Sequence, residues 1–212
     1  MSGNGSVIAR ETPETGGFSR VPNGIFDLVV LRSMARKLLV TLRALELPVN
    51  KPLPLRYSFE ERHGRAHRMI IFTPHDLLAL NQLAFVGFVS SRRKMLDQQI
   101  IDELFRVDQQ MLGELVHVPD LLSYSSLELR KGNWYNLVVL REIAARSHFR
   151  TLETHRYAAD QLSPAYYEWI RLHHGSLPGG LTLQEMVLHS TKFYCFPAMQ
   201  QSPAVRELIY KK

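Results

Sequence analysis

The chain has 212 residues, a formal net charge of +6 and 45% hydrophobic residues. This balance is typical of a folded domain and excludes a wholly disordered chain or a collagen-like repeat. The one cysteine, Cys195, cannot form a disulfide within the chain, and no apolar run is long enough to cross a membrane. We therefore expect a cytoplasmic protein. A moderately basic charge permits an anionic partner but does not require one.

The first part of the chain is predicted to be a tail followed by a helix. Residues 1–24 are rich in Gly, Ser, Thr, Asn and Pro and lack an apolar period, which predicts a flexible tail. Over residues 25–47, apolar side chains recur at three- and four-residue steps, which predicts a helix that ends at Pro48. A linker and a short strand candidate at 69–72 follow, so residues 25–80 are predicted to form a helical N-terminal extension and linker.

Six elements are predicted between Leu83 and His174. In chain order they are strand, helix, strand, strand, helix and strand, over residues 83–90, 92–112, 121–129, 134–141, 147–162 and 166–173. The strands are indicated by aromatic and β-branched residues, and the helices by apolar stripes preceded by capping serines, Ser90 or Ser91 and Ser147. A loop at 175–180, a last strand at 186–196 and a tail at 197–212 complete the prediction.

The order of these six elements is that of a split βαβ, or ferredoxin-like, unit. The segment 83–196 is therefore predicted to be a ferredoxin-like barrel domain with an extra C-terminal strand. The unit from Leu83 to His174, with that strand after it, resembles the dimeric α/β-barrel superfamily. That group includes antibiotic-biosynthesis monooxygenases, haem-degrading monooxygenases and chlorite-dismutase-like haem proteins. The resemblance covers less than half of the chain and rests on element order. It implies an α+β fold in which a second subunit covers the open face of the sheet, giving a homodimer.

The alternation of side chains along each strand indicates where a site would lie. Trp169, Arg171 and His173 share one face of the last strand of the unit. The two preceding strands contribute a polar and aromatic set, which consists of Tyr124, Ser126, Glu128, Trp134 and Asn136. If the three strands are in phase, all of these side chains converge on the open face. Such a surface would suit a small aromatic or apolar molecule.

Three of these side chains are candidates for catalysis. His173 could act as a general base, Arg171 could pair with a carboxylate, and Glu128 could accept a proton or hold a histidine in one tautomer. The remaining five are assigned to ligand binding: Trp134, Asn136, Trp169, Tyr124 and Ser126. No metal site is predicted, unless His173 binds the iron of a haem. The same aromatic and arginine residues would also suit a dimer interface, and that alternative stays open.

The resemblance implies a small-molecule oxidoreductase acting on an aromatic or apolar ligand. It would be either a cofactor-free monooxygenase, in which Asn136, Trp134 and His173 orient and deprotonate the substrate, or a haem protein with His173 as axial ligand. The alternative is a non-catalytic ligand-binding or assembly protein that uses the aromatic face as a dimer interface. Nucleic-acid binding is not favoured, because no known module is present. The basic stripe of Arg32, Arg36 and Arg43 is interpreted as a solvated face rather than a membrane contact by residues 27–47.

Overall fold

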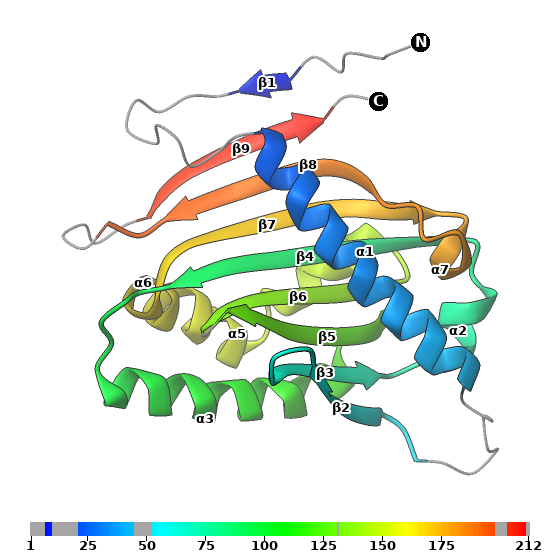
Figure 1. Cartoon of the computed structure of the whole chain (residues 1–212), viewed down its shortest axis with the longest axis horizontal. Coiled ribbons are helices and arrows are strands. Elements are labelled where there is room, and N and C mark those ends of the chain that lie inside the picture. Colours follow the sequence, from blue (N-terminus) through cyan, green and yellow to red (C-terminus); the bar gives the residue numbers. More distant parts are fainter. Residues whose placement is uncertain (1–6, 10–20, 45–51, 131, 198–202, 211–212) are drawn as a thin grey trace.

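The protein is an α+β structure built on one antiparallel sheet (Figure 1). The computed structural model describes residues 7–9, 21–44, 52–130, 132–197 and 203–210. The strands are β1 (Val7–Ala9), β2 (Leu55–Glu61), β3 (Arg65–Ile71), β4 (Gln82–Arg92), β5 (Leu121–Arg130), β6 (Asn133–Leu140), β7 (Tyr167–Pro178), β8 (Val187–Cys195) and β9 (Ala204–Tyr210). Their spatial order is β1-β9-β8-β7-β4-β6-β5-β3-β2, so the strands that follow the N-terminal extension lie in the middle of the sheet.

Helices lie on both faces of this sheet. They are α1 (Val21–Ala44), α2 (Pro74–Ala79), α3 (Gln98–Glu114), η1 (Leu115–His117), η2 (Ile143–Ala145), α4 (Arg146–Phe149), α5 (Glu153–Tyr157), η3 (Ala158–Leu162), α6 (Ser163–Tyr166) and α7 (Gly180–Leu183). The helix predicted at 25–47 is confirmed as α1, while Pro48 lies outside the described residues.

α1 crosses one face of the sheet diagonally (Figure 1). Its three- and four-residue apolar spacing places Leu31, Leu38 and Leu42 against the sheet, where they are fully buried with Phe85 and Leu137. From the sequence, a second subunit is expected on the open face of the sheet. The structure instead places a helix of the same chain there, so the need to cover this face gives no reason for a dimer.

The opposite face of the sheet packs against α3 and the short helices between β6 and β7. Leu112 and Leu115 from this layer are buried with Tyr124 and Val138 of the sheet. The predicted capping of α3 by Ser90 or Ser91 is wrong, because β4 continues to Arg92 and pairs both serines with β7. The cap is Asp97, whose side chain accepts a hydrogen bond from the backbone N–H of Gln99 at 2.9 Å.

Several predicted boundaries also differ from the structure. The helix predicted at 147–162 is broken into α4, α5 and η3. The loop predicted at 175–180 begins too early, because Gly175 and Ser176 continue β7 and pair with β4 and β8. The tail predicted at 197–212 contains β9, which extends the sheet beyond β8. The tail predicted at 1–24 contains β1 and the start of α1, and its remaining residues lie outside the described ranges.

Candidate functional site

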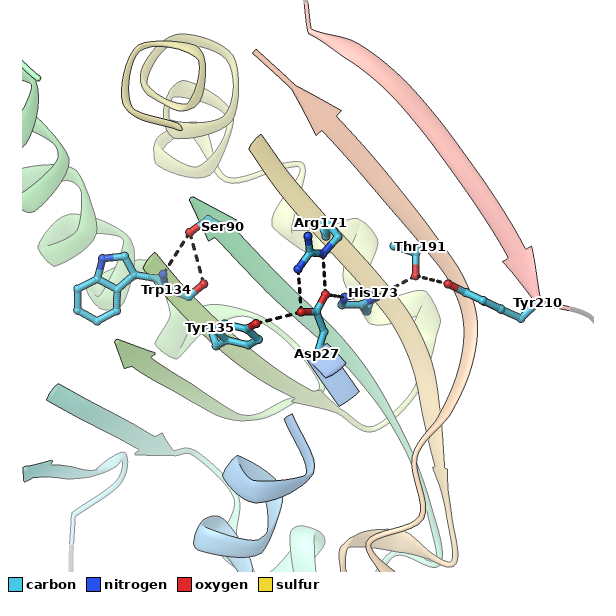
Figure 2. Close-up of polar contacts among 8 residues, drawn as sticks. All are labelled: Asp27, Ser90, Trp134, Tyr135, Arg171, His173, Thr191 and Tyr210. Carbon is cyan, nitrogen blue, oxygen red and sulfur yellow. Dashed lines mark hydrogen bonds and ion pairs between the residues drawn. The ribbon is translucent and has the colours of Figure 1, made fainter. Parts of the chain in front are cut away.

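The candidate site is centred on Asp27, an α1 carboxylate that is 1% exposed. α1 carries it over β6 and β7, whose side chains surround it (Figure 2). Arg171 donates to both carboxylate oxygens, from Nε to Oδ2 at 2.6 Å and from Nη2 to Oδ1 at 2.8 Å. Nε2 of His173 lies 2.8 Å from Oδ2, and the Tyr135 hydroxyl donates to Oδ1 at 2.9 Å. Each oxygen of this buried carboxylate therefore accepts two hydrogen bonds.

The histidine extends the hydrogen bonds to the next two strands. His173 is fully buried, and its Nδ1 lies 2.8 Å from the Thr191 hydroxyl of β8. That hydroxyl lies 3.2 Å from the Tyr210 hydroxyl of β9. Because Nε2 faces a carboxylate, which can only accept, the ring donates there, and Nδ1 is the atom that contacts the Thr191 hydroxyl. We call these six residues the Asp27 network: Asp27, Tyr135, Arg171, His173, Thr191 and Tyr210.

The charges in the Asp27 network keep the carboxylate ionised. Burial raises the pKa of Asp27, but the hydrogen bonds and charges of His173 and Arg171 outweigh it and hold the pKa below its ordinary value of 3.8. The pKa of Tyr135 is raised, first by burial and then by the negative charge of Asp27. The Arg171 guanidinium also lies 4.3 Å from the ring centroid of Trp169, a cation–π contact. Near neutral pH, the network therefore holds an ion pair and a protonated phenol.

A glycine allows α1 to approach the sheet beside the Asp27 network. Gly87 of β4 lies opposite His173 in the register of β4 and β7. A Cβ at this position would lie 2.5 Å from Cδ1 of Leu31 and 3.4 Å from Cβ of His173. A side chain here would push the helix outward, so the absence of one sets the spacing between Asp27 and its partners.

The predicted site residues do not converge on one surface. One face of the sheet, the one that faces α1, carries Trp169, Arg171 and His173. Across the neighbouring strands, the row on this face consists of His173, Gly87 and Leu137. The adjacent row faces the α3 side, and it consists of Leu172, Phe88, Asn136, Ser126 and Arg68. Tyr124, Glu128 and Trp134 share that second face. The predicted convergence is wrong, because alternation within a strand does not say which faces align across strands.

The five residues on the α3 side have their own surroundings. The ring of Trp134 points away from the Asp27 network (Figure 2). The side chain of Glu128 accepts a hydrogen bond from the backbone N–H of Gly132 at 2.6 Å, so it supports the β5–β6 turn. Burial, followed by the charge of Asp108, raises the pKa of Tyr124 to about 12.

Arg68, Ser126 and Asn136 lie opposite one another on three neighbouring strands, and we call them the α3-side row. Arg68 binds Asp108 of α3 through two hydrogen bonds of 2.8 and 3.1 Å. Two atoms of the row, Nε of Arg68 and Oδ1 of Asn136, are buried and have no hydrogen-bond partner within the described part of the chain. Buried polar atoms are normally satisfied, so the row has the capacity for two further hydrogen bonds.

Four residues of the Asp27 network are not predicted as site residues from the sequence: Asp27, Tyr135, Thr191 and Tyr210. One signal was available for Asp27, the only acidic residue of α1, because it lies four residues before Leu31 on the stripe that faces the sheet. A carboxylate on a buried helical stripe requires a buried cationic or hydrogen-bonding partner. No comparable signal marks Thr191 or Tyr210, which look like ordinary strand residues.

Three further findings concern the described part of the chain. Among the described residues, no group of three or more His, Cys, Asp or Glu side chains could bind a metal ion. In the same ranges, no helix has the length and apolar character needed to span a bilayer. A cavity of about 260 Å³ lies near the start of β5, and Phe72, Leu121 and Arg141 are among its lining residues. None of its lining residues belongs to the Asp27 network.

No family model matches the chain, and no curated protein or solved structure is similar to it at a significant level. The geometry of the Asp27 network and of the surfaces around it is therefore the basis for a functional assignment.

Proposed function

We propose that the protein is a non-catalytic binding or assembly module in which α1 is a permanent layer of the scaffold. The observation that carries this proposal is the engagement of Arg171 and His173 with Asp27 of the same chain. Arg171 and His173 are two of the three side chains that were assigned to catalysis from the sequence. Asp27 occupies the position that the carboxylate of a ligand would need, so the two side chains serve to hold α1 on the sheet.

The cost of removing α1 supports the same conclusion. A ligand could reach His173 from the α1 side only if α1 moved away. That movement would expose Leu31, Leu38 and Leu42, each at most 1% exposed, and would break the Asp27 ion pair. Exposing each leucine costs about 1.5–3 kcal/mol. With the neighbouring buried side chains of α1, the total is on the order of 10 kcal/mol, comparable to the stability of a whole domain.

We further propose that β4, α3, β5, β6, the short helices and β7 form a ferredoxin-like unit. The spatial order β7-β4-β6-β5, with every neighbouring pair antiparallel, supports this assignment. In this proposal α1 takes the place that a second subunit has in a dimeric barrel. Any homodimer of this chain would then use another surface.

A second candidate function is a small-molecule enzyme with its site on the α3 side. The α3-side row favours it, because the row offers a buried donor and a buried acceptor that have no partner among the described residues, with Trp134 on the same face. In this version an oxidoreductase, cofactor-free or haem-dependent, would contact an aromatic or apolar ligand through Trp134, Asn136, Tyr124 and Ser126. His173 faces the opposite side of the sheet and would take no part.

The absorption spectrum of the purified full-length chain separates the binding module from an enzyme that holds haem or flavin. A binding module is expected to show only the absorbance of its aromatic residues. A Soret band or a flavin band that Asn136→Ala abolishes would favour the enzyme. Ser123→Ala is the matched control, because Ser123 is a buried β5 serine on the opposite face of the sheet.

Hydrogen exchange tests whether α1 is permanent. Amides from Leu31 to Leu42 are expected to exchange as slowly as those in the middle of β4, because α1 should open only when the whole domain unfolds. Fast exchange in α1 beside slow exchange in β4 would show that the helix opens separately. That result would contradict the proposal, because His173 would then be accessible in the folded protein.

A further inference from the structure

The outer face of α1 presents apolar side chains to solvent. Ile25, Phe26 and Val29 are 60%, 70% and 61% exposed, and Val40, further along the helix, is 56% exposed. These positions recur with the helical period, so they form one stripe opposite the side chains that pack on the sheet. Large apolar groups gathered on one face in this way mark a surface that meets a partner or a membrane.

The same face of α1 is basic, and within the described helix it carries no acidic side chain. α1 contains Arg32, Arg36, Lys37 and Arg43, and its only acidic residue is the buried Asp27. Lys37 is directed toward β2, where it lies 3.5 Å from the Glu61 carboxylate. Arg32 donates to the backbone carbonyl of Met186 at 3.4 Å. Arg36 and Arg43 are exposed, and together with the apolar side chains they make the stripe both cationic and apolar.

The positive charge and the apolar character of the stripe together indicate which partner it fits. A second copy of the chain would bring basic side chains against basic side chains, which is unfavourable. Nucleic acid would match the charge, but three of the four apolar side chains of the stripe are aliphatic, and aliphatic groups cannot stack on bases as aromatic platforms do. The surface of an anionic bilayer suits both the arginines and the apolar side chains, because its headgroups attract arginine and its acyl boundary takes up apolar groups.

We propose that the outer face of α1 binds the surface of an anionic lipid bilayer, with the helix axis parallel to the membrane plane. Ile25, Phe26 and Val29 enter the boundary between headgroups and acyl chains, while Arg36 and Arg43 contact the headgroups. At 1.5 Å per residue, Ile25 and Arg43 are about 27 Å apart along the axis, so the whole length of the helix is in contact. This inference rests on the proposed function, because a permanently docked α1 always has this face outward.

Co-sedimentation of the full chain with lipid vesicles tests the contribution of the arginines on α1. The protein is expected to bind vesicles that contain about 30% phosphatidylserine and not to bind vesicles of pure phosphatidylcholine. About 0.5 M salt should release the bound protein. The double variant Arg36→Glu, Arg43→Glu should lower the partition coefficient at least about 25-fold, since each basic residue contributes about fivefold. The control Arg146→Glu, Arg156→Glu makes the same change in net charge on the α3 side and should retain binding.

A matched pair of phenylalanines tests the apolar part. Phe26 on α1 is 70% exposed and Phe105 on α3 is 68% exposed, so neither substitution should disturb the fold. Phe26→Ser is expected to weaken partitioning about tenfold, whereas Phe105→Ser should leave it unchanged.

Three results would overturn the inference. They are no binding of the wild-type chain to anionic vesicles at low salt, equal losses in the α1 and control variants, and capture of nucleic acid or an acidic protein without vesicle binding. If α1 amides exchange slowly but the protein does not bind vesicles, the membrane inference is wrong and the proposed binding module is still supported. If α1 amides exchange fast, the proposed function fails whatever the vesicles show.

Discussion

Replacing Asp27 by asparagine is expected to destabilise the protein far more than the change of one atom suggests. Each carboxylate oxygen accepts an N–H of Arg171, at 2.6 and 2.8 Å. An asparagine amide turned either way would place its NH2 group against a guanidinium N–H. The substitution also leaves Arg171, which is 8% exposed, without its counter-charge. Breaking a buried ion pair from one side costs about 3–5 kcal/mol.

Urea denaturation followed by circular dichroism measures this loss. The change is a large share of the roughly 5–15 kcal/mol that stabilises a typical domain, and it corresponds to a fall in Tm of about 10 °C. The matched control is Asp76→Asn, because Asp76 pairs with Arg141 at the surface, where both side chains are more than 30% exposed. Exposed ion pairs contribute about 1 kcal/mol or less, so this control should stay near the wild type.

The double variant Asp27→Asn, Arg171→Met decides whether the unpaired charge is the cause. Removing the guanidinium removes the buried charge, so the double variant should recover most of the stability. The reasoning would be refuted by an Asp27→Asn variant within about 0.5 kcal/mol of the wild type, or by a double variant no more stable than the single one.

The pH dependence gives an independent check on Asp27. Its pKa is lower in the folded state than the ordinary value of 3.8. Its contribution is therefore complete above that value and is lost as the pH falls through the folded pKa. The difference in stability between the wild type and Asp27→Asn should narrow below about pH 4. A difference that stays constant down to about pH 2 would contradict this assignment.

Three further predictions concern single positions, all measured by urea denaturation. Burial and the nearby charge of Arg146 lower the pKa of His174 from 6.5 to about 4. The free energy of unfolding should therefore fall as the pH drops from about 6.5 to about 4, and it should fall less steeply in His174→Asn. Equal pH dependence in the two proteins would contradict this. Gly87→Ala should cost about 1–3 kcal/mol, because its Cβ would meet Leu31; an unchanged midpoint would show that α1 adjusts freely. Gly113→Ala in α3 should add up to about 1 kcal/mol, since nothing lies within 4 Å of that Cβ; a loss would mean that α3 is strained.

Local patterns were sufficient for the elements with strong apolar periods. The spacing of leucines in α1 and the apolar run of β6 place these two elements close to their observed bounds. The strand candidate at 69–72 corresponds to the end of β3. By contrast, β2, the first part of β3 and β9 were missed, because these stretches carry many charged residues. Such segments become strands by pairing with a neighbour already in place, and the sequence of the segment alone does not show that neighbour.

For the candidate site, the sequence determined one part and the tertiary structure decided the rest. The two-residue period of a strand puts Arg171 and His173 on the same face, because successive Cβ atoms point to opposite sides. Their partner Asp27 lies 144 residues before Arg171 and reaches it only because α1 crosses β7. Likewise, the register between strands separated Asn136 and Trp134 from His173. Side-chain alternation is a property of local backbone geometry, whereas register and the docking of a helix on one face depend on packing across the whole chain.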